Sequence, residues 1–298
     1  MPAWSASLKS LGFLNLSPLR LIKAGLFSGL LLASHIPASA AEETMLPLMF
    51  DARERLSRPD LSSVVRVRIL TSADFPPFNF ADQTGRLAGF NVDLAREICT
   101  ELKIEAKCQI QAMPFDELEK ALESGAGEAV MAGIAITPER RTRFNFTRPY
   151  LGIPARFARH KEVKLEGPAA TALAEKTVGV VGGTTHEAML KAFFPKLTPK
   201  PFDNADAMLE ALKSHQVDAV FADGLRLPFW VAGEASANCC ALFDGPYLSE
   251  KFLGEGVAVM LAKSDPLLPA AFDQALSVLS RNGRLQDIYL RYFPHGLY

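Results

Sequence analysis

Apolar segments that suit β-strands alternate along this chain with segments that have the spacing of amphipathic helices. In chain order they are a strand at 64–72, a helix from Phe90 to Leu102, a strand at 106–113, a helix at 115–125 and a strand at 129–136. The first helix has Phe90, Leu94, Ile98 and Leu102 four residues apart, which places them on one face. Strands that alternate with helices predict βαβ units and therefore a sheet with mostly parallel strands.

A second α/β unit follows the first. It consists of a strand at 176–183, helices at 184–194 and 205–216, and a strand at 217–223. A late strand at 255–263 and a helix–turn–helix at 268–293 end the chain. Thr184 precedes Glu187 by three residues, which is typical of a capping box at a helix start. Residues 75–80 ("FPPFNF") are expected to form a loop, because two prolines block regular hydrogen bonding.

The composition is that of a globular protein with room for one large or two medium domains. The chain has 298 residues, of which 49% are hydrophobic and 22% charged, and its net charge is −1. The chain has no excess of basic residues, so its charge does not indicate a nucleic-acid partner. Residues 41–64 form a polar, arginine-rich lead-in with no clear period.

The first forty residues have the pattern of a secretory signal peptide. Three basic residues precede or begin an apolar run, no acidic residue occurs, and the segment ends in Ala38-Ser39-Ala40. A cleaved signal at 1–40 therefore predicts export to the periplasm, and the alternatives are a membrane anchor or a poorly packed helix. No later segment reaches the roughly 18 consecutive apolar residues that a membrane-spanning helix needs.

The cysteines and histidines do not form a recognisable metal motif. There is no CxxC pair, and no Cys/His spacing suits zinc. Cys99 and Cys108 can close a short disulfide, whereas adjacent Cys239 and Cys240 are expected to be reduced or bonded elsewhere. The five histidines are scattered and are interpreted as structural: His35, His160, His186, His215 and His295. No cofactor is expected, since "GVVGGTT" lacks the lysine of a P-loop.

Several polar side chains follow the predicted strands. In open α/β sheets, ligands bind beyond the carboxyl ends of the strands. Arg140 follows the strand at 129–136, Thr184 and Thr185 begin a helix, and Asp223 ends a strand. A guanidinium, a carboxylate and free N–H groups at a helix start together suit a zwitterionic ligand.

Six stretches in order carry a resemblance to a known family. They are "TSADFPPFNF", "GFNVDLAREI", "MAGIAITPERRTRFNFTRPY", "GVVGGTTHE", "VDAVFAD" and "ALSVLSRNGRLQDIYLRYF". The chain resembles the family 3 periplasmic solute-binding proteins, the polar-amino-acid receptors of ABC importers, over nearly all of its length after the lead-in. The resemblance implies an α/β fold of two lobes (type II) joined by two hinge crossovers. Lobe 1 is then 65–150 plus 256–298, and lobe 2 is 157–247, with the ligand between them.

The resemblance also implies roles for individual residues. Arg140 matches the arginine that clamps the ligand carboxylate, and Thr184 and Thr185 match the helix start that closes on the same carboxylate. Asp223 matches the acid that binds the ammonium group. The neighbouring arginines are interpreted as surface charges: Arg141, Arg143 and Arg148. The alternatives are that Arg140 pairs with Glu139 or Asp116 in a turn, and that Asp223 is a helix cap.

Three further positions match the walls of the family's site. Phe75 and Phe115 match aromatic residues that cover the ligand, although aromatic side chains more commonly belong to a core. Gly133 matches a position where backbone groups meet the ligand amino group. The resemblance also places Cys99 and Cys108 near a disulfide of some basic-amino-acid receptors, with a loop two residues longer.

The sequence departs from the family pattern in ways that bear on the ligand. Ala135 stands where many members have a hydroxyl on the carboxylate. Ser72 stands where lysine or histidine receptors often have an acid, which argues against a basic ligand. We expect a monomeric binding protein rather than an enzyme, with a small amino acid or carboxylate as ligand and a membrane permease as partner. The alternatives are a cyclohexadienyl or arogenate dehydratase, in which position 223 is a glutamate, and an accessory binding protein for a dehydrogenase or sensor.

Overall fold

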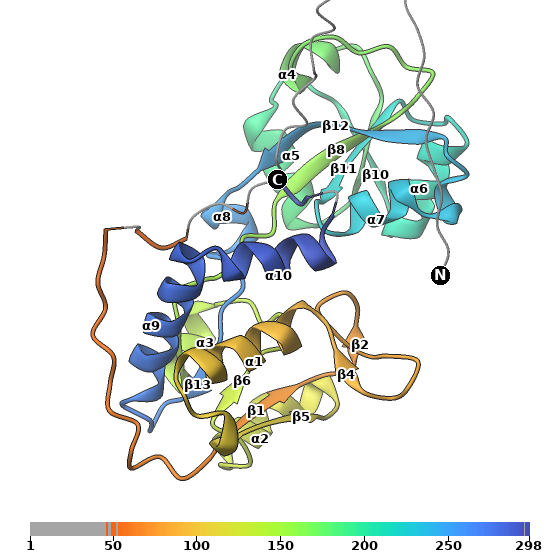
Figure 1. Cartoon of the computed structure of the whole chain (residues 1–298). Helices are drawn as coiled ribbons and strands as arrows, with labels where there is room; N and C mark the ends of the chain where they lie inside the picture. The colour runs from red at the N-terminus through yellow and green to blue at the C-terminus, as the bar shows by residue number, and fades with distance from the viewer. Residues whose placement is uncertain (1–45, 47–48, 52, 295) are drawn as a thin grey trace, which may run out of the picture. The chain divides into compact units, whose positions relative to one another are not determined.

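The chain contains two five-stranded sheets and a small three-stranded sheet within its described residues (Figure 1). A computed structural model describes residues 46, 49–51, 53–294 and 296–298. The predicted signal peptide, residues 1–40, lies outside the described residues. No helix in the described part of the chain is both long and apolar enough to span a bilayer. The α/β class predicted from the alternating pattern is confirmed.

The first sheet has the strand order β5-β1-β6-β13-β7. Its strands are β1 (Val67–Thr71), β5 (Cys108–Ala112), β6 (Ala129–Val130), β7 (Phe144–Phe146) and β13 (Met260–Ala262). β1 pairs in parallel with β5 and β6, whereas β13 pairs antiparallel with β6 and β7. The prediction of mostly parallel strands is confirmed for this sheet, since β1, β5, β6 and β7 run in one direction and only β13, added where the chain returns from the second lobe, runs in the opposite direction.

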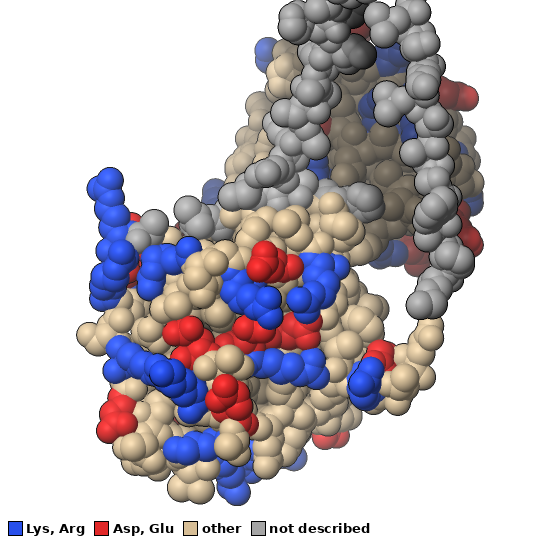
Figure 2. Space-filling view, viewed as in Figure 1, with Lys and Arg blue, Asp and Glu red and all other residues tan. Residues whose placement is uncertain are grey.

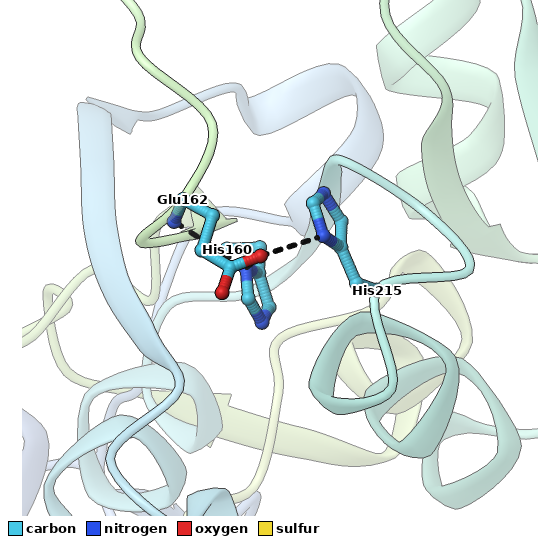
Figure 3. Close-up of side chains that lie close together, drawn as sticks. All are labelled: His160, Glu162 and His215. Carbon is cyan, nitrogen blue, oxygen red and sulfur yellow. Dashed lines mark hydrogen bonds and ion pairs between the residues drawn. The ribbon is translucent and has the colours of Figure 1, made fainter.

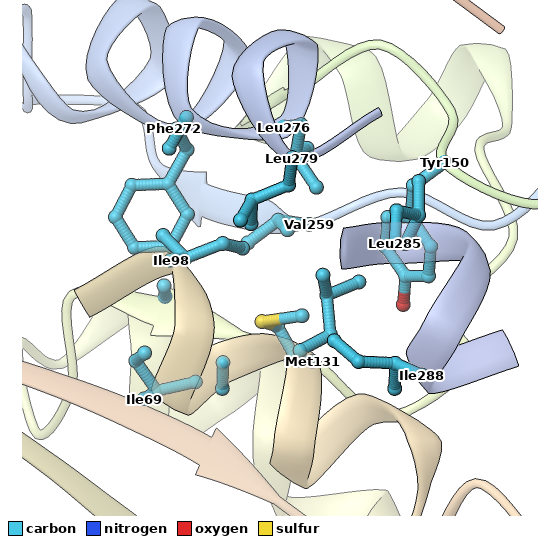
Figure 4. Close-up of a cluster of buried hydrophobic side chains, with 14 of the residues drawn as sticks. Ile69, Ile98, Met131, Tyr150, Val259, Phe272, Leu276, Leu279, Leu285 and Ile288 are labelled. Atoms are coloured by element: carbon cyan, nitrogen blue, oxygen red, sulfur yellow. The ribbon is translucent and has the colours of Figure 1, made fainter. Parts of the chain in front are cut away.

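Three long helices cover one face of the first sheet. The helices of this lobe are α1 (Phe90–Glu101), η1 (Glu105–Lys107), η2 (Phe115–Glu117), α2 (Leu118–Glu123), α3 (Pro138–Arg143), α9 (Leu268–Arg281) and α10 (Arg284–Tyr292). α1, α9 and α10 pack against one another (Figure 1). Figure 4 shows Ile98 of α1, Phe272 and Leu276 of α9 and Ile288 of α10 directed into one buried cluster. Segments from both ends of the chain thus share one core.

The second sheet has the order β10-β9-β11-β8-β12 and is also mixed. Its strands are β8 (Ala155–His160), β9 (Val178–Val181), β10 (Pro199–Phe202), β11 (Ala219–Asp223) and β12 (Cys240–Tyr247). Its helices are α4 (Ala169–Ala172), α5 (Thr185–Phe193), α6 (Ala205–Lys213), α7 (Arg226–Ala232), η3 (Glu234–Ser236) and α8 (Glu250–Leu253). Its hydrophobic residues form two clusters of their own.

Two chain segments, 147–154 and 248–259, connect the two sheets. They lie beside each other, since Leu151 forms an isolated bridge with Val257. Gly256 has φ +115°, and a Cβ there would lie 2.7 Å from the carbonyl oxygen of Leu151. A glycine is therefore required for the two segments to approach so closely. The lobe limits inferred from the resemblance stay predictions.

Residues 75–80 were predicted as a loop, and the structure corrects this in part. They contribute to a small sheet of β2 (Asp74–Phe75), β3 (Asn79–Ala81) and β4 (Leu87–Ala88), with Pro76 and Pro77 in the turn. Phe78 is fully buried against Phe90 and Phe293. Its side chain therefore belongs to the core and is not accessible to a ligand.

Both pairs of cysteines form disulfides. Cys99 of α1 is bonded to Cys108 of β5, which confirms that pairing. Cys239 is bonded to its neighbour Cys240. The expectation that these two are reduced or bonded elsewhere was wrong, because their sulfur atoms are bonded to each other directly after a turn in which Ala237 and Asn238 both have left-handed backbone angles.

Removing the Cys99–Cys108 bond by a double alanine substitution should lower the melting temperature by about 5–10 °C. A cross-link over a separation of 9 residues restricts the unfolded chain and stabilises a protein by about 2–3 kcal/mol. Cys239→Ala with Cys240→Ala is the matched control, since a bond between adjacent residues closes almost no loop. Calorimetry that shows equal losses for the two double variants would contradict the entropic explanation.

Candidate functional site

A cavity of about 1080 Å³ lies where the β2–β3 turn meets elements of the second sheet. Phe75, Pro76 and Pro77 line it from the first lobe, and Ile153 lines it from one connecting segment. The wall from the second lobe includes Thr184, His186, Phe221, Asp223, Phe229 and Trp230. The cavity therefore lies beyond the carboxyl ends of β9 and β11, where ligands of α/β sheets bind.

Phe75 forms one wall of the cavity and stays partly open to solvent. Its ring stacks on that of Phe78 with a centroid distance of 5.1 Å and is 38% exposed. Gly133 lies against the same ring, since a Cβ at this position would be 3.0 Å from Phe75. Gly133 has φ +74°, a conformation that glycine adopts without strain. Phe115, on η2, is 47% exposed and is not among the cavity's lining residues.

Asp223 ends β11 and enters the cavity as the chain turns into α7. Its Oδ1 accepts hydrogen bonds from the backbone N–H of Leu225 (2.7 Å) and of Arg226 (3.2 Å). Its Oδ2 has no hydrogen-bond partner among the residues that the structure describes. Oδ1 thus binds N–H groups at the start of α7, although the N-cap residue itself is Leu225, and Oδ2 can serve a ligand at the same time.

Thr184 has the local geometry that the capping-box pattern predicts. Its Oγ1 accepts a hydrogen bond from the N–H of Glu187 (3.3 Å) and donates to the carbonyl of Val181 (2.7 Å). The carboxylate of Glu187 accepts from the N–H of Gly183 (2.8 Å). Thr184 lines the cavity, whereas Thr185, the first residue of α5, is exposed and does not.

Arg140 lies on α3, which Thr137 caps by accepting a hydrogen bond from the N–H of Arg140. Its Nε donates to Glu119 (2.8 Å) and its Nη1 to the carbonyl of Ala135 (3.1 Å). The alternative partners Glu139 and Asp116 were wrong, because Glu119 of α2 faces the guanidinium instead. Arg140 is not among the residues that line the cavity, and within the described chain its Nη2 has no partner.

The other arginines of this stretch are paired at the surface, as predicted. Arg143 forms ion pairs with Glu119 (3.0 Å) and Glu123 (2.8 Å). The remaining two pairs are Arg141 with Glu255 and Arg148 with Glu54. Figure 2 shows acidic and basic side chains interspersed on the visible face of the first lobe. Such exposed pairs contribute little to stability and do not form a basic patch.

The cavity is also lined by residues that the sequence analysis did not predict to bind a ligand. His186 of α5 and the aromatic residues Phe229 and Trp230 of α7 line it. α7 carries Pro228 in its sequence, which hides its helical pattern. Burial lowers the pKa of His186, and the carboxylate of Asp223 opposes this shift only in part.

His186 should make the protein less stable on the acidic side of neutrality. Because its folded pKa is lowered, the unfolded chain binds a proton more readily, and stability falls as the pH drops through the unfolded value of about 6.5. Above that value the contribution is absent. Between pH 7 and pH 5, the melting temperature of wild type should therefore fall further than that of His186→Gln. Parallel curves for the two proteins would show that His186 does not titrate differently in the folded state.

Ser72, which replaces the acid of some basic-amino-acid receptors, belongs to a buried chain of polar side chains. Nδ2 of Asn79 donates to Oγ of Ser72 (2.8 Å), and Nδ2 of Asn91 donates to Oδ1 of Asn79 (2.9 Å). The Tyr150 hydroxyl donates to Oδ1 of Asn91 (2.7 Å), and its burial raises its pKa. Ser72 thus helps to join β1, β3 and α1 and brings no charge toward the cavity.

Residues 67–295 match the bacterial extracellular solute-binding proteins, family 3. The chain belongs to this family. It is 33% identical to the L-arginine-binding protein of Pseudomonas aeruginosa over 82% of this chain and 93% of that protein. It is 27% identical to the lysine/arginine/ornithine-binding periplasmic protein of Escherichia coli over 78% of this chain and 89% of that protein. The predicted family is thereby confirmed.

Solved structures support the same fold. Substrate binding domain 2 of Lactococcus lactis GlnP, in an open conformation, matches with a TM-score of 0.63 and 22% identity over 80% of this chain and 98% of that one. An ancestral cationic amino acid solute binding protein matches with a TM-score of 0.57 and 26% identity over 78% and 97%. The fold is that of a two-lobed, type II periplasmic binding protein.

Proposed function

We propose that this protein is the solute-binding component of an ABC importer and captures an α-amino acid between its two lobes. The family and the amino-acid-binding relatives support this function. The observation that carries it is Oδ2 of Asp223, which has no hydrogen-bond partner among the described residues and belongs to a side chain that lines a large cavity. We also propose export through a cleaved signal peptide at 1–40, a monomeric state and a permease in the inner membrane as partner.

The proposal gives the two charged groups of a zwitterion separate partners. The ligand ammonium binds Oδ2 of Asp223, and the ligand carboxylate binds the guanidinium of Arg140. Because Arg140 does not line the cavity and is paired with Glu119, the lobes must close for both contacts to form. A ligand that bridges the lobes then stabilises the closed state, as in other hinge-closing proteins. Closure would bring Thr185, Gly133 and Phe115 to the same ligand.

The side chain of the ligand is the remaining question. The relatives are named for arginine, lysine and ornithine, whereas Ser72 supplies no charge and the cavity walls include Phe75, Phe221 and Trp230. A thermal-shift screen of the standard amino acids and ornithine distinguishes a cationic from an uncharged ligand. A ligand at 100 times its Kd stabilises by about 2.7 kcal/mol, a rise of about 5–10 °C for a protein of this size. Failure of every amino acid to raise the melting temperature would refute the proposed function.

An enzymatic function is the second candidate. An ancestral amino-acid-binding protein described as a precursor of cyclohexadienyl dehydratase matches this chain with a TM-score of 0.50 and 25% identity. The resemblance described above implies a glutamate at the position of Asp223 in such dehydratases, and the aspartate here favours binding. Turnover of prephenate or arogenate by the purified protein would reverse this conclusion.

A further inference from the structure

We propose that His160, Glu162 and His215 form a binding site for a divalent transition metal, for which Zn²⁺ is the probe. One ligand atom of each residue lies within 4.8 Å of the others. Figure 3 shows the Glu162 carboxylate beside the imidazole of His160 and joined to that of His215 by a dashed line, and the two histidines are 55 residues apart in the chain. The sequence analysis interpreted both histidines as structural because nothing in their spacing brings them together.

The distances around Glu162 are close to those of a coordinated metal. Oε2 of Glu162 lies 3.2 Å from Nδ1 of His215 and 3.9 Å from Nδ1 of His160. Two ligand atoms on a tetrahedral Zn²⁺, each about 2.0–2.1 Å from the metal, are separated by about 3.3 Å. The first pair already has this spacing. The second needs a small movement of the Glu162 side chain, which is 73% exposed. Nδ1 of His160 must also give up the hydrogen bond that it accepts from the N–H of Glu162 (3.4 Å).

The turn that follows β8 places the side chains of His160 and Glu162 close together. His160 ends β8, and the chain turns at once, so that Glu162 lies back over it. Nη1 of Arg159 donates to the carbonyls of His160, Lys161 and Val163 and so stabilises this turn. Lys161 directs its ammonium group to Asn238, away from the two imidazoles.

His215 reaches the site because it follows the end of α6 in a left-handed conformation. Its φ is +56°, at a position where helices commonly end in glycine. Its ring stacks on that of His160 with a centroid distance of 4.2 Å and an angle of 7°. The lone pairs of parallel rings do not converge on one point, so metal binding requires the more exposed ring, His215, to rotate.

Asp218 supplies the outer partner that metal-bound histidines commonly have. Its Oδ1 lies 3.8 Å from Nε2 of His215, on the opposite side of the ring from Glu162, and its Oδ2 accepts from the N–H of Thr177 (2.8 Å). This distance is too long for a hydrogen bond. A small rotation of His215 that shortens it would let Asp218 orient the imidazole and keep Nδ1 for the metal. Two histidines and one glutamate are a known zinc ligand set that leaves a fourth position open for water or for a ligand from another molecule.

The proposed site is separate from the solute cavity. Asp223 pairs with Ala155 at one end of the β8–β11 ladder, while His160 lies at the other end of β8. Five residues of extended chain separate the two ends by roughly 17 Å. Zinc binding is therefore expected in Asp223→Asn as well, so this inference and the proposed function can fail independently.

Calorimetric titration of ZnCl₂ into purified, chelator-treated protein without a polyhistidine tag tests the site. No reductant is added, so that the four cysteines remain in disulfides and offer no thiolate. We expect one Zn²⁺ per chain. His215→Ala and Glu162→Gln should weaken binding by about 100-fold, and Asp218→Asn by about 10–100-fold. Both directly substituted side chains are partly or fully exposed, so the variants should fold, which circular dichroism checks.

Glu166→Gln is the matched control, because Glu166 is an exposed acid on the same loop with no part in the cluster. It should bind Zn²⁺ as wild type does. Absence of Zn²⁺ binding by wild type at micromolar concentrations would overturn the proposal. Equal affinities for wild type, His215→Ala and Glu162→Gln would also overturn it, since the metal would then bind elsewhere.

Discussion

Replacing Arg140 with alanine should weaken amino-acid binding by about 30-fold or more and leave the melting temperature of the ligand-free protein almost unchanged. Truncating one member of a desolvated charge pair costs about 2–5 kcal/mol of binding free energy. In the ligand-free protein, Arg140 loses a partly exposed pair with Glu119 and an exposed hydrogen bond to the carbonyl of Ala135. Exposed pairs of this kind contribute about 0–1 kcal/mol. Calorimetric titration with the ligand found in the screen measures the first effect, and thermal unfolding measures the second.

Arg141→Ala is the control for this experiment. Arg141 lies next to Arg140 on α3 but pairs with Glu255 at the surface. It should bind the ligand as wild type does. If Arg140→Ala instead lowers the melting temperature strongly and keeps its affinity, then the guanidinium has a structural role through Glu119 and the proposed carboxylate clamp is wrong.

Replacing Asp223 with asparagine should weaken binding by a similar factor while the start of α7 stays intact. An asparagine side-chain oxygen can still accept the hydrogen bonds from Leu225 and Arg226, so the cap is kept. The substitution removes the negative charge that Oδ2 offers to the ligand ammonium. The effect should therefore appear in the affinity for amino acids and be absent from the stability of the free protein.

Two comparisons make the Asp223 result specific. Glu210→Gln is the control, because Glu210 is an exposed acid of the same lobe that pairs with Lys213, and neither residue lines the cavity. A carboxylic acid analogue of the ligand that lacks the amino group should bind wild type and Asp223→Asn with similar affinity. A loss of affinity for that analogue in Asp223→Asn would show that the carboxylate acts on the shape of the site and not on the ammonium group.

Local sequence patterns were sufficient to predict the helices that have one apolar face or a capping residue at their start. The spacing of Phe90, Leu94 and Ile98 predicted α1, and Thr184 with Glu187 predicted the start of α5. These features depend on contacts between residues three or four positions apart, and this spacing can be read directly from the sequence. The capping role of Asp223 was recognised as an alternative for the same reason, since its partners follow it by two and three residues.

Elements whose stability comes from distant partners were not predictable in this way. Leu46, Phe50 and Leu61 of the irregular lead-in are buried in the core of the first lobe, although no period marks them. β8 and β12 pair antiparallel inside the second sheet and make it mixed. Such segments gain their hydrogen bonds and apolar contacts from residues far along the chain, so their own sequence carries little signal.

The sequence by itself determined the fold class, the family and the local caps, because these follow from short-range spacing and from motifs in a constant order. Only the tertiary structure decided that Arg140 faces Glu119 and that His160 and His215 stack beside Glu162. It also placed Asp223 at a cavity wall, with no hydrogen-bond partner for its Oδ2 in the described part of the chain. Each of these features depends on segments that are distant in the chain. The fold sets the distance between such segments in space, and their spacing in the sequence does not predict it.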